Sequence, residues 1–200
     1  MDPLNESSLD GDRALVAKVQ QGDRVAFDLL VRKYQHRILK FVTRYVHDAN
    51  LAQDITQESF MRAYRSIRSF RGESAFYTWL YRIAINVAKN HLSLNARRFE
   101  ESLTESSDSN GMDGIEAMQS MDTPDALLIS DEVRKAVVDA IQDLAPDLRT
   151  AILLREVEGF SYEAIAQAMN CPVGTVRSRI FRAREAINAR LEPHLSGSGG

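Results

Sequence analysis

The sequence has little of several residues that mark particular protein classes: one cysteine, Cys171, five prolines and ten glycines among 200 residues. A single cysteine excludes a disulfide-stabilised scaffold and is typical of a reducing compartment. No apolar run approaches the roughly 18 residues of a membrane span, and the acidic N-terminus lacks the apolar core of a signal peptide. Since 44 % of residues are apolar and 26 % are charged, a wholly disordered chain is excluded. We expect a cytoplasmic globular protein.

Residue clusters that perform enzyme chemistry are also missing. The sequence has no Gly-rich phosphate loop and no nucleophile elbow. Asp54 and Glu58 are four residues apart and could share a cation, but no Glu-x-x-His unit accompanies them, and an exposed acidic surface for a protein partner explains them better. No metal-ligand spacing joins the four histidines, His36, His47, His91 and His194. We expect no enzyme activity, no metal and no cofactor.

The formal net charge of −3 averages three unlike segments. Residues 1–99 hold sixteen basic and ten acidic residues, a net charge of +6. Residues 100–133 hold ten acidic residues and no basic ones, and residues 134–200 have a net charge of +1. Basic segments on either side of an acidic middle favour nucleic-acid binding. Affinity for nucleic-acid phosphates increases with the number of cationic side chains that contact them. Because the net positive charge of these segments is small, we do not expect tight binding to nucleic acid without a partner.

The acidic segment 97–130 is interpreted as a flexible linker, because it is rich in Ser, Asp, Glu and Gly and has no hydrophobic period. It is either a solvated tether or a segment that docks in a basic channel of a partner. The linker divides the chain into a first domain, 1–96, and a second domain, 131–195, followed by a flexible tail, 196–200.

Both domains are predicted to be helical, so the fold class is all-α. Apolar residues recur at spacings of three and four in four segments of the first domain, about 12–21, 23–46, 50–67 and 74–94. The second domain contains four shorter segments of the same kind, about 131–143, 147–156, 162–169 and 172–191. A pattern of period two, which would indicate strands, persists nowhere.

The strongest motif lies between residues 161 and 187. Ser161 is a helix cap, Asn170 suits a left-handed helix end, and Pro172 suits the first turn of a new helix. A short helix, a tight turn and a longer helix form a helix-turn-helix, whose second helix enters the major groove of DNA. The residues left on the outer faces of that helix are Thr175, Arg177, Ser178, Phe181 and Arg182. An ordinary basic pair of amphipathic helices is the alternative.

A second candidate site combines aromatic and basic residues between 60 and 98. Seven of the fifteen aromatic residues fall between Phe60 and Tyr81, and rings interleaved with cations suit single-stranded nucleic acid. Arg82, Asn86 and Lys89 share one polar helix face, where an amide could read a flipped base. The alternative is that the rings belong to the core, which we favour for Phe60, Tyr64 and Trp79.

Long runs of this sequence resemble one family. The segments FRGESAFYTWLYRIAINVAKNHL and CPVGTVRSRIFRAREAI are similar to the two DNA-reading regions of bacterial extracytoplasmic-function (ECF) sigma factors, nearest to the sigma-E (AlgU-like) branch. The likeness covers most of residues 12–95 and 131–191. Sigma factors bind core RNA polymerase and direct it to promoters, so the resemblance implies transcription initiation at promoters with −10 and −35 elements.

The resemblance also implies roles for particular residues of the first domain. The first domain would dock on the clamp of the largest polymerase subunit through its third predicted helix, with the residues Asp54, Gln57, Glu58 and Arg62. It would read and open the −10 element with the loop after that helix and the polar face of the fourth, with the residues Phe70, Arg71, Gly72, Ser74, Ala75, Arg82, Asn86 and Lys89.

In the second domain the resemblance assigns recognition of the −35 element to Arg177, Ser178, Phe181 and Arg182, beside Thr175, and Arg155 matches a position that contacts the DNA backbone. This domain would sit on the flap of the other large polymerase subunit. The linker would thread towards the active-site and RNA-exit channel. The resemblance further implies a membrane-anchored anti-sigma factor and a role in envelope or extracytoplasmic stress.

Three other functions explain less of the sequence. A stand-alone helix-turn-helix repressor or activator would need a dimer seam, and the heptad pattern for one is missing. A nuclease or resolvase would need a carboxylate cluster or an activated nucleophile, whereas the acidic residues concentrate in the linker. A pure interaction protein with an acidic segment imitating nucleic acid leaves the basic face at 175–184 unexplained.

Overall fold

The computed structural model describes residues 6–105 and 131–196, and the surroundings of side chains within 8–94 and 133–192. Every regular element in these ranges is a helix, which confirms the predicted all-α class. The predicted linker falls largely outside the described residues, as does most of the predicted tail. Within the described ranges, no helix has the length and hydropathy needed to cross a membrane.

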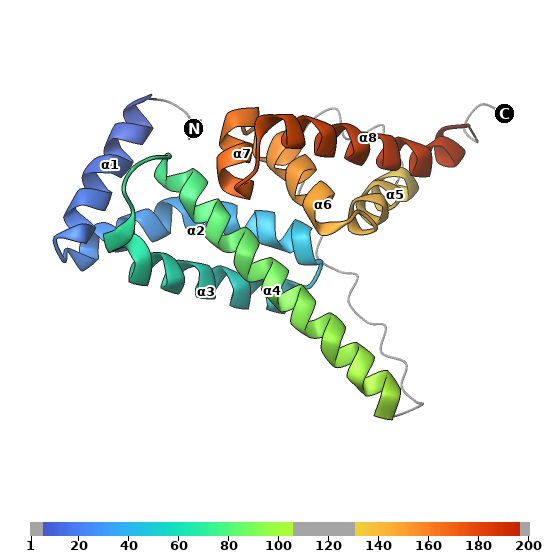
Figure 1. Ribbon diagram of the computed structural model, residues 1–200, viewed down its shortest axis with the longest axis horizontal. Coiled ribbons are helices and arrows are strands. Elements are labelled where there is room, and N and C mark those ends of the chain that lie inside the picture. The colour runs from blue at the N-terminus through green and yellow to red at the C-terminus, as the bar shows by residue number, and fades with distance from the viewer. Residues whose placement is uncertain (1–5, 106–130, 197–200) are drawn as a thin grey trace.

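Four helices form the first half of the described chain, and Figure 1 shows their arrangement. They are α1 (Glu6–Gln20), α2 (Arg24–Val46), α3 (Ala49–Ser66) and α4 (Phe76–Glu105), with a 3₁₀ turn, η1 (Ile67–Ser69), after α3. Asp23 and Asp48 cap α2 and α3 by accepting hydrogen bonds from the backbone N–H groups of Ala26 and Leu51, as expected for N-cap carboxylates. The apolar stripe of α2 packs against the other three helices.

Helix α1 begins at Glu6, whereas the sequence predicts a start near residue 12. Contacts of residues before the predicted start account for the difference, because Leu9 packs against the core and the Ser8 carbonyl accepts a hydrogen bond from the Lys33 ammonium of α2. Asp12 attaches the same helix to α2. This carboxylate is 1 % exposed and accepts hydrogen bonds from the Tyr34 hydroxyl and the Lys33 ammonium of α2. Burial raises the pKa of Tyr34 far above its ordinary value, and the Asp12 hydrogen bond adds to that effect.

Substitution of Asp12 by alanine should lower the free energy of unfolding by about 2 kcal/mol, because the buried Tyr34 hydroxyl is left without an acceptor. Urea denaturation of the full chain measures the effect. Asp10→Ala is the matched control: Asp10 pairs with Arg13 at the surface, with side chains 73 % and 81 % exposed, so its loss should change stability by less than about 0.5 kcal/mol. Equal losses in the two variants would contradict a structural role for Asp12.

Helix α4 continues to Glu105, beyond the predicted helix end near residue 94 and into the segment predicted as linker. The segment 95–105 contains neither glycine nor proline and is rich in Glu and Arg, both of which favour a helix. The predicted boundary between first domain and linker, at residues 96 and 97, therefore lies inside α4.

The second half of the described chain contains four helices and one π-helical turn. These are α5 (Asp131–Gln142), α6 (Pro146–Ile152), η3 (Leu153–Val157), α7 (Tyr162–Met169) and α8 (Val173–Ser196). Helices α5, α6 and α7 each pack against α8. The π-helical turn η3 continues α6 directly, and Gly159, with φ +70°, ends it, as expected for a residue that tolerates a left-handed conformation.

The two halves lie in direct contact. Helix α7 packs against α4, and η3 packs against α2. The second half therefore covers the side of α2 and α4 that lies opposite α3 (Figure 1). Buried apolar residues of both halves form one continuous cluster. No pattern in the amino-acid sequence predicts this arrangement.

Candidate nucleic-acid and polymerase interfaces

The helix-turn-helix forms as its local signals predict. The Ser161 hydroxyl accepts a hydrogen bond of 3.1 Å from the Ala164 N–H at the start of α7, and Asn170 ends the helix with φ 50° and ψ 52°. Pro172 then accepts hydrogen bonds from the N–H groups of Thr175 and Val176 in the first turn of α8. Burial of Val176, Ile180 and Ala183 fixes the rotation of α8 about its axis.

That rotation leaves a stripe of candidate reading residues on the outside of α8, formed by Arg177, Ser178, Phe181 and Arg182. All four are exposed, and the Phe181 side chain is 62 % exposed. An exposed aromatic ring costs free energy in water unless a ligand covers it. Within the described residues, no carboxylate forms an ion pair with Arg177 or Arg182. Both guanidinium groups are therefore available to a ligand, with Arg177 over the Tyr162 ring at 5.9 Å.

Other predicted or basic residues near this stripe already have partners inside the protein. Arg155 donates a hydrogen bond of 2.8 Å to the Phe160 carbonyl and stacks over Tyr162 at 5.0 Å, so it orders the turn before α7. Thr175 is half-buried, and its carbonyl accepts a hydrogen bond from Ser178. In this structure Arg179 pairs with Asp147, while Arg184 pairs with Glu156.

In the first half, packing and hydrogen bonds fix the beginning of the loop from Phe70 to Ala75, whereas its centre is exposed to solvent. The half-buried Phe70 ring packs against Trp79 at 4.9 Å. Gln20 of α1 donates hydrogen bonds of 2.9 Å to the carbonyls of Ile67 and Phe70. Arg71 and Gly72 are exposed, Gly72 with φ +72°, and Ser74 and Ala75 are half-buried. Gln20 thus positions the loop, a role that the sequence analysis misses.

The predicted polar face of α4 contains two exposed residues and one residue that forms an ion pair within the protein. Arg82 and Asn86 are exposed. Lys89 is half-buried and pairs with Asp147 of α6 at 2.6 Å. The Lys89 hydrogen bond is the main cause that lowers the pKa of Asp147 below its ordinary value of 3.8, so the carboxylate is charged at neutral pH.

Most aromatic rings of the 60–81 segment are structural. Phe60 and Trp79 are buried, as the sequence analysis favours, and the rings of Phe76, Tyr77 and Tyr81 are buried as well. Tyr64 departs from that prediction, because its side chain is 42 % exposed beside the Phe27 ring, at 4.9 Å. Nucleic-acid bases can therefore stack only on the rings of this segment that reach the protein surface, because the other rings are buried in the core.

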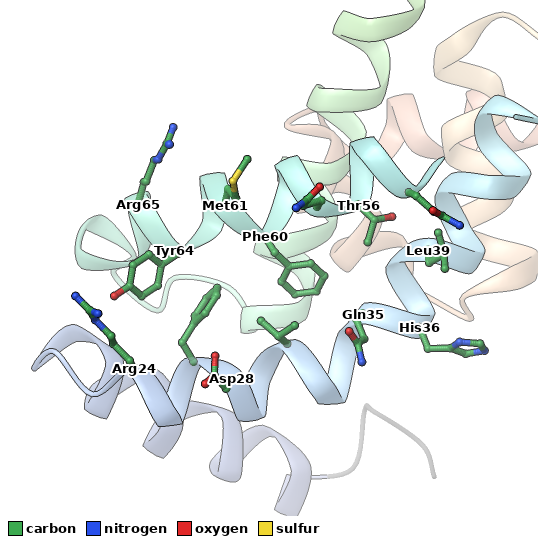
Figure 2. Close-up of a pocket in the computed structure, with 14 residues that line it drawn as sticks. Arg24, Asp28, Gln35, His36, Leu39, Thr56, Phe60, Met61, Tyr64 and Arg65 are labelled. Carbon is green, nitrogen blue, oxygen red and sulfur yellow. The ribbon is translucent and has the colours of Figure 1, made fainter. Parts of the chain in front are cut away.

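Tyr64 belongs to a groove between α2 and α3 with a volume of about 890 Å³. Figure 2 shows Phe60 and Tyr64 of α3 pointing toward α2 across this groove, with Arg24 and Asp28 of α2 opposite. Met61, 47 % exposed, lines the same groove. An apolar floor with a charged rim is the composition of a protein-docking surface.

The four predicted contacts on α3 do not share one face. Gln57 lines the groove, and Asp54 is exposed. Glu58 turns toward α4, where its carboxylate lies 2.8 Å from His91 Nε2 and 2.6 Å from the Arg62 guanidinium. The His91 hydrogen bond is the main cause that lowers the pKa of Glu58. Glu58 and Arg62 therefore neutralise each other.

Helix α2 carries a second exposed apolar surface, formed by two residues that do not line the groove. Val25 and Leu29 are large apolar residues that lie off the buried stripe of α2, and they are 67 % and 47 % exposed. Two exposed apolar residues one helical turn apart indicate a surface that a partner covers.

Comparison with known proteins identifies both halves. A family model described as Sigma-70 region 2 matches residues 30–98, and one described as Sigma-70, region 4 matches residues 134–187. The RNA polymerase sigma-H factor of Pseudomonas aeruginosa is 56 % identical over 184 residues, 92 % of this chain and 95 % of that protein. The ECF RNA polymerase sigma-E factor of Escherichia coli K12 is 50 % identical over 182 residues, 91 % of this chain and 95 % of that protein.

Two solved structures have a similar fold. The sigma factor RpoE in complex with the anti-sigma factor NepR, from Bartonella quintana, has a TM-score of 0.63 and 25 % identity, and the match covers 83 % of this chain and 96 % of that one. CnrH in complex with the cytosolic domain of CnrY has a TM-score of 0.65 at 21 % identity, covering 92 % and 98 %, which supports the fold alone. With both regions present in order and close relatives along nearly its whole length, this chain belongs to the ECF sigma factors of bacterial RNA polymerase.

Proposed function

We propose that this sigma factor directs core RNA polymerase to promoters by reading a −35 element with α8 and a −10 element with α4 and the loop before it. The observation that carries the proposal is the exposed stripe Arg177, Ser178, Phe181 and Arg182 on the second helix of a capped helix-turn-helix. In this motif such residues contact base edges in the major groove.

For the −35 element, the chemistry of the stripe favours direct reading of bases. An arginine can bond a guanine edge with two hydrogen bonds, which discriminates against a wrong base by about 1–3 kcal/mol. Phe181 suits a thymine methyl group, and Ser178 suits a phosphate or a base edge. Arg155 acts indirectly in this proposal, because its guanidinium supports the turn that precedes the motif.

For the −10 element, Asn86 and Arg82 form the accessible part of the α4 face, and the 70–75 loop lies at the start of that helix. An amide can pair with the edge of a base that has left the duplex. Arg71 lies at the open centre of the loop, where it can hold the phosphates of the separated strand. Lys89 joins this face when it leaves Asp147.

For polymerase, the α2–α3 groove is the proposed docking surface for the clamp of the largest subunit, with Gln57 on its wall and Asp54 on the same helix. Glu58 and Arg62 contribute by holding α3 against α4 through His91. The second half would bind the flap of the other large subunit. We further propose cytoplasmic action in response to extracytoplasmic stress, under a membrane-anchored anti-sigma factor. A protein of similar fold, the sigma factor RpoE of Bartonella quintana, was solved in complex with the anti-sigma factor NepR.

The test mixes the purified full chain with bacterial core RNA polymerase and measures co-elution and run-off transcription from promoters of the sigma-E type. The proposal expects co-elution, and start sites that require both this chain and an intact −35 and −10 sequence. Tight, sequence-specific footprints on duplex DNA without polymerase, together with failure to bind core, would instead indicate a repressor or activator.

Substitution of Asn86 by alanine should reduce open-complex formation roughly tenfold while binding to core polymerase is unchanged, because the lost hydrogen bonds to a flipped base are worth about 1.4 kcal/mol. Permanganate reactivity of unpaired thymines at the −10 element measures opening. Asn50→Ala, which removes an exposed amide at the start of α3, is the control. Loss of core binding in Asn86→Ala would mean that Asn86 has a structural role.

A further inference from the structure

One side chain of α1 holds the backbone at the beginning of the 70–75 loop. Gln20 Nε2 lies 2.9 Å from the carbonyl oxygens of both Ile67 and Phe70. An amide nitrogen carries two N–H groups, so a single glutamine can donate to both carbonyls at once. The first carbonyl opens η1 and the second follows it. These two bonds therefore set the direction in which the chain enters the loop.

The end of α1 gives Gln20 a fixed position. The neighbouring Val19 is buried in the core, and α1 packs against η1. Gly22, with φ +101°, ends the helix, and the Asp23 N–H donates to the Lys18 carbonyl at 3.0 Å, which is the longer bond of a Schellman motif. The Gln20 side chain therefore reaches the loop from a backbone that core packing and the helix end both restrain.

The Phe70 ring attaches the same loop to the helix that carries the candidate −10 residues. It packs against Trp79 with ring centroids 4.9 Å apart, and edge-to-face against Phe76 at 6.2 Å. Arg82 and Asn86 follow Trp79 by three and seven positions on α4, so the three residues lie on one side of that helix. The loop thus begins on the side of α4 that presents the polar residues, and its position decides how far its centre lies from Asn86.

The centre of the loop has no comparable support. Among the residues that the structure describes, none forms a hydrogen bond or an ion pair with Arg71, Gly72 or Glu73, and all three are exposed. The position of the centre is therefore determined by the two ends of the loop. The start of α4 fixes one end, and the two Gln20 hydrogen bonds together with the Phe70 ring fix the other.

Discrimination between bases depends on such positioning. A site distinguishes two bases by the difference between their binding free energies. A loop that moves by about 1 Å takes a donor from bonding distance, about 2.9 Å, to a distance at which the hydrogen bond is lost. The base that fits then loses affinity, whereas a base that never made the bond loses little. Support of the loop therefore affects the ratio of the affinities more than their average.

We propose that Gln20 is a positioning residue for the −10 element: by binding the carbonyls of Ile67 and Phe70 it sets the loop against α4, and thereby the choice of base at this site. The proposal rests on the proposed function and extends it to α1, a helix to which neither the residue patterns nor the family resemblance assigns a part in reading DNA. Gln20 itself does not touch DNA, because both of its N–H groups are used within the protein.

Three variants of the full chain test this role. Gln20→Met has a side chain of similar length without N–H donors, and the bonds that it removes are only partly buried, so water can reach the two carbonyls and the fold should persist. Gln20→Lys keeps N–H donors at a similar reach, and its charge suits the last turn of a helix. Gln21→Met is the matched control, the same substitution at the exposed neighbour. Urea denaturation should give all three variants midpoints close to that of the wild type.

Two measurements distinguish positioning from a general structural role. The sequence contains one tryptophan, Trp79, and its ring contacts Phe70, so quenching of its fluorescence by acrylamide in the free chain reports on the beginning of the loop. Fluorescence anisotropy then measures binding of each holoenzyme, assembled with core polymerase, to single-stranded −10 oligonucleotides. The oligonucleotides carry the −10 sequence of a sigma-E-type promoter and each of its single-base replacements, and the ratios of the affinities measure base choice.

Gln20→Met should increase the quenching of Trp79 and lower the preference for the promoter base roughly threefold to tenfold at one or more −10 positions, the effect of one or two lost hydrogen bonds. Gln20→Lys should recover most of that preference, and Gln21→Met should behave as the wild type.

Two results would overturn the role of Gln20. One is increased quenching in Gln20→Met with unchanged affinity ratios, and the other is an equal loss of affinity for every oligonucleotide. The wild-type holoenzyme tests the proposed function separately. If it showed no preference among the oligonucleotides, the reading of the −10 element would fail and this inference with it. A wild-type preference that Gln20→Met retains would contradict the inference alone.

Discussion

Combined substitution of Arg177 and Arg182 by alanine should lower transcription from −35-dependent promoters by roughly a hundredfold and relax the choice of bases at that element. Each arginine that bonds a guanine edge contributes about 1–3 kcal/mol of discrimination, and the effects of two such contacts add when they are independent. Both side chains are exposed on α8, so their removal should leave the fold unchanged. Run-off transcription on a panel of −35 variants measures both the loss and the relaxation.

The control for this prediction is Arg190→Ala. Arg190 is also an exposed arginine of α8, and it pairs weakly with Asp143 at 3.6 Å, away from the first turns of the helix. Its removal should change transcription by less than about twofold, the effect of an exposed ion pair. If the double variant kept the wild-type preference among −35 variants, the stripe on α8 would not be the reading surface.

Replacement of Met61 by glutamate should weaken binding of core RNA polymerase by roughly a hundredfold. Met61 is 47 % exposed in the α2–α3 groove, so the free chain accommodates a carboxylate there in contact with water. When polymerase covers the groove, the carboxylate would be buried without a partner, a loss that reaches several kcal/mol. Affinity measured by competition with the wild-type chain for core polymerase gives the size of the effect.

Leu94→Glu is the matched control for the groove, because Leu94 is 50 % exposed on α4 and does not line the groove. The same change from apolar to acidic should there leave core affinity within about twofold, since a solvated charge costs little. Equal losses in the two variants would indicate a general effect of negative charge, and the groove would then not be the docking surface.

The local structure follows from local sequence. The three- and four-residue spacing of apolar residues predicts the helices. Ser161, Asn170 and Pro172 predict the start, end and restart of the helix-turn-helix, because caps and turns depend on the few residues around them. The exposed stripe on α8 is predictable for the same reason, since burial of Val176 and Ile180 fixes which residues of that helix face outward.

Predictions that depend on distant partners are less accurate. The predicted start of α1 is wrong because the Ser8 carbonyl, which precedes it, is bound by Lys33, a contact across 25 positions. Tyr64 is predicted as core but lies in a groove, because whether a ring on α3 is covered depends on the angle and distance at which α2 crosses it. Lys89 and Glu58 lie at positions that the resemblance assigns to partners, yet each is bound to a residue far along the chain.

By itself, the sequence determined the all-α class, the helix-turn-helix and the identity of the residues that α8 presents, because these depend on periodicity and on caps within a few residues. Only the tertiary structure decided the groove between α2 and α3 and the contact of the second half with α4. In that contact Phe160 packs against Tyr77 and Tyr81, Glu158 accepts a hydrogen bond from Tyr81, and Asp147 pairs with Lys89. Those features join residues that are far apart in the sequence, from 37 positions for Phe27 with Tyr64 to 83 for Tyr77 with Phe160. Their formation depends on how whole helices pack, which no local pattern encodes.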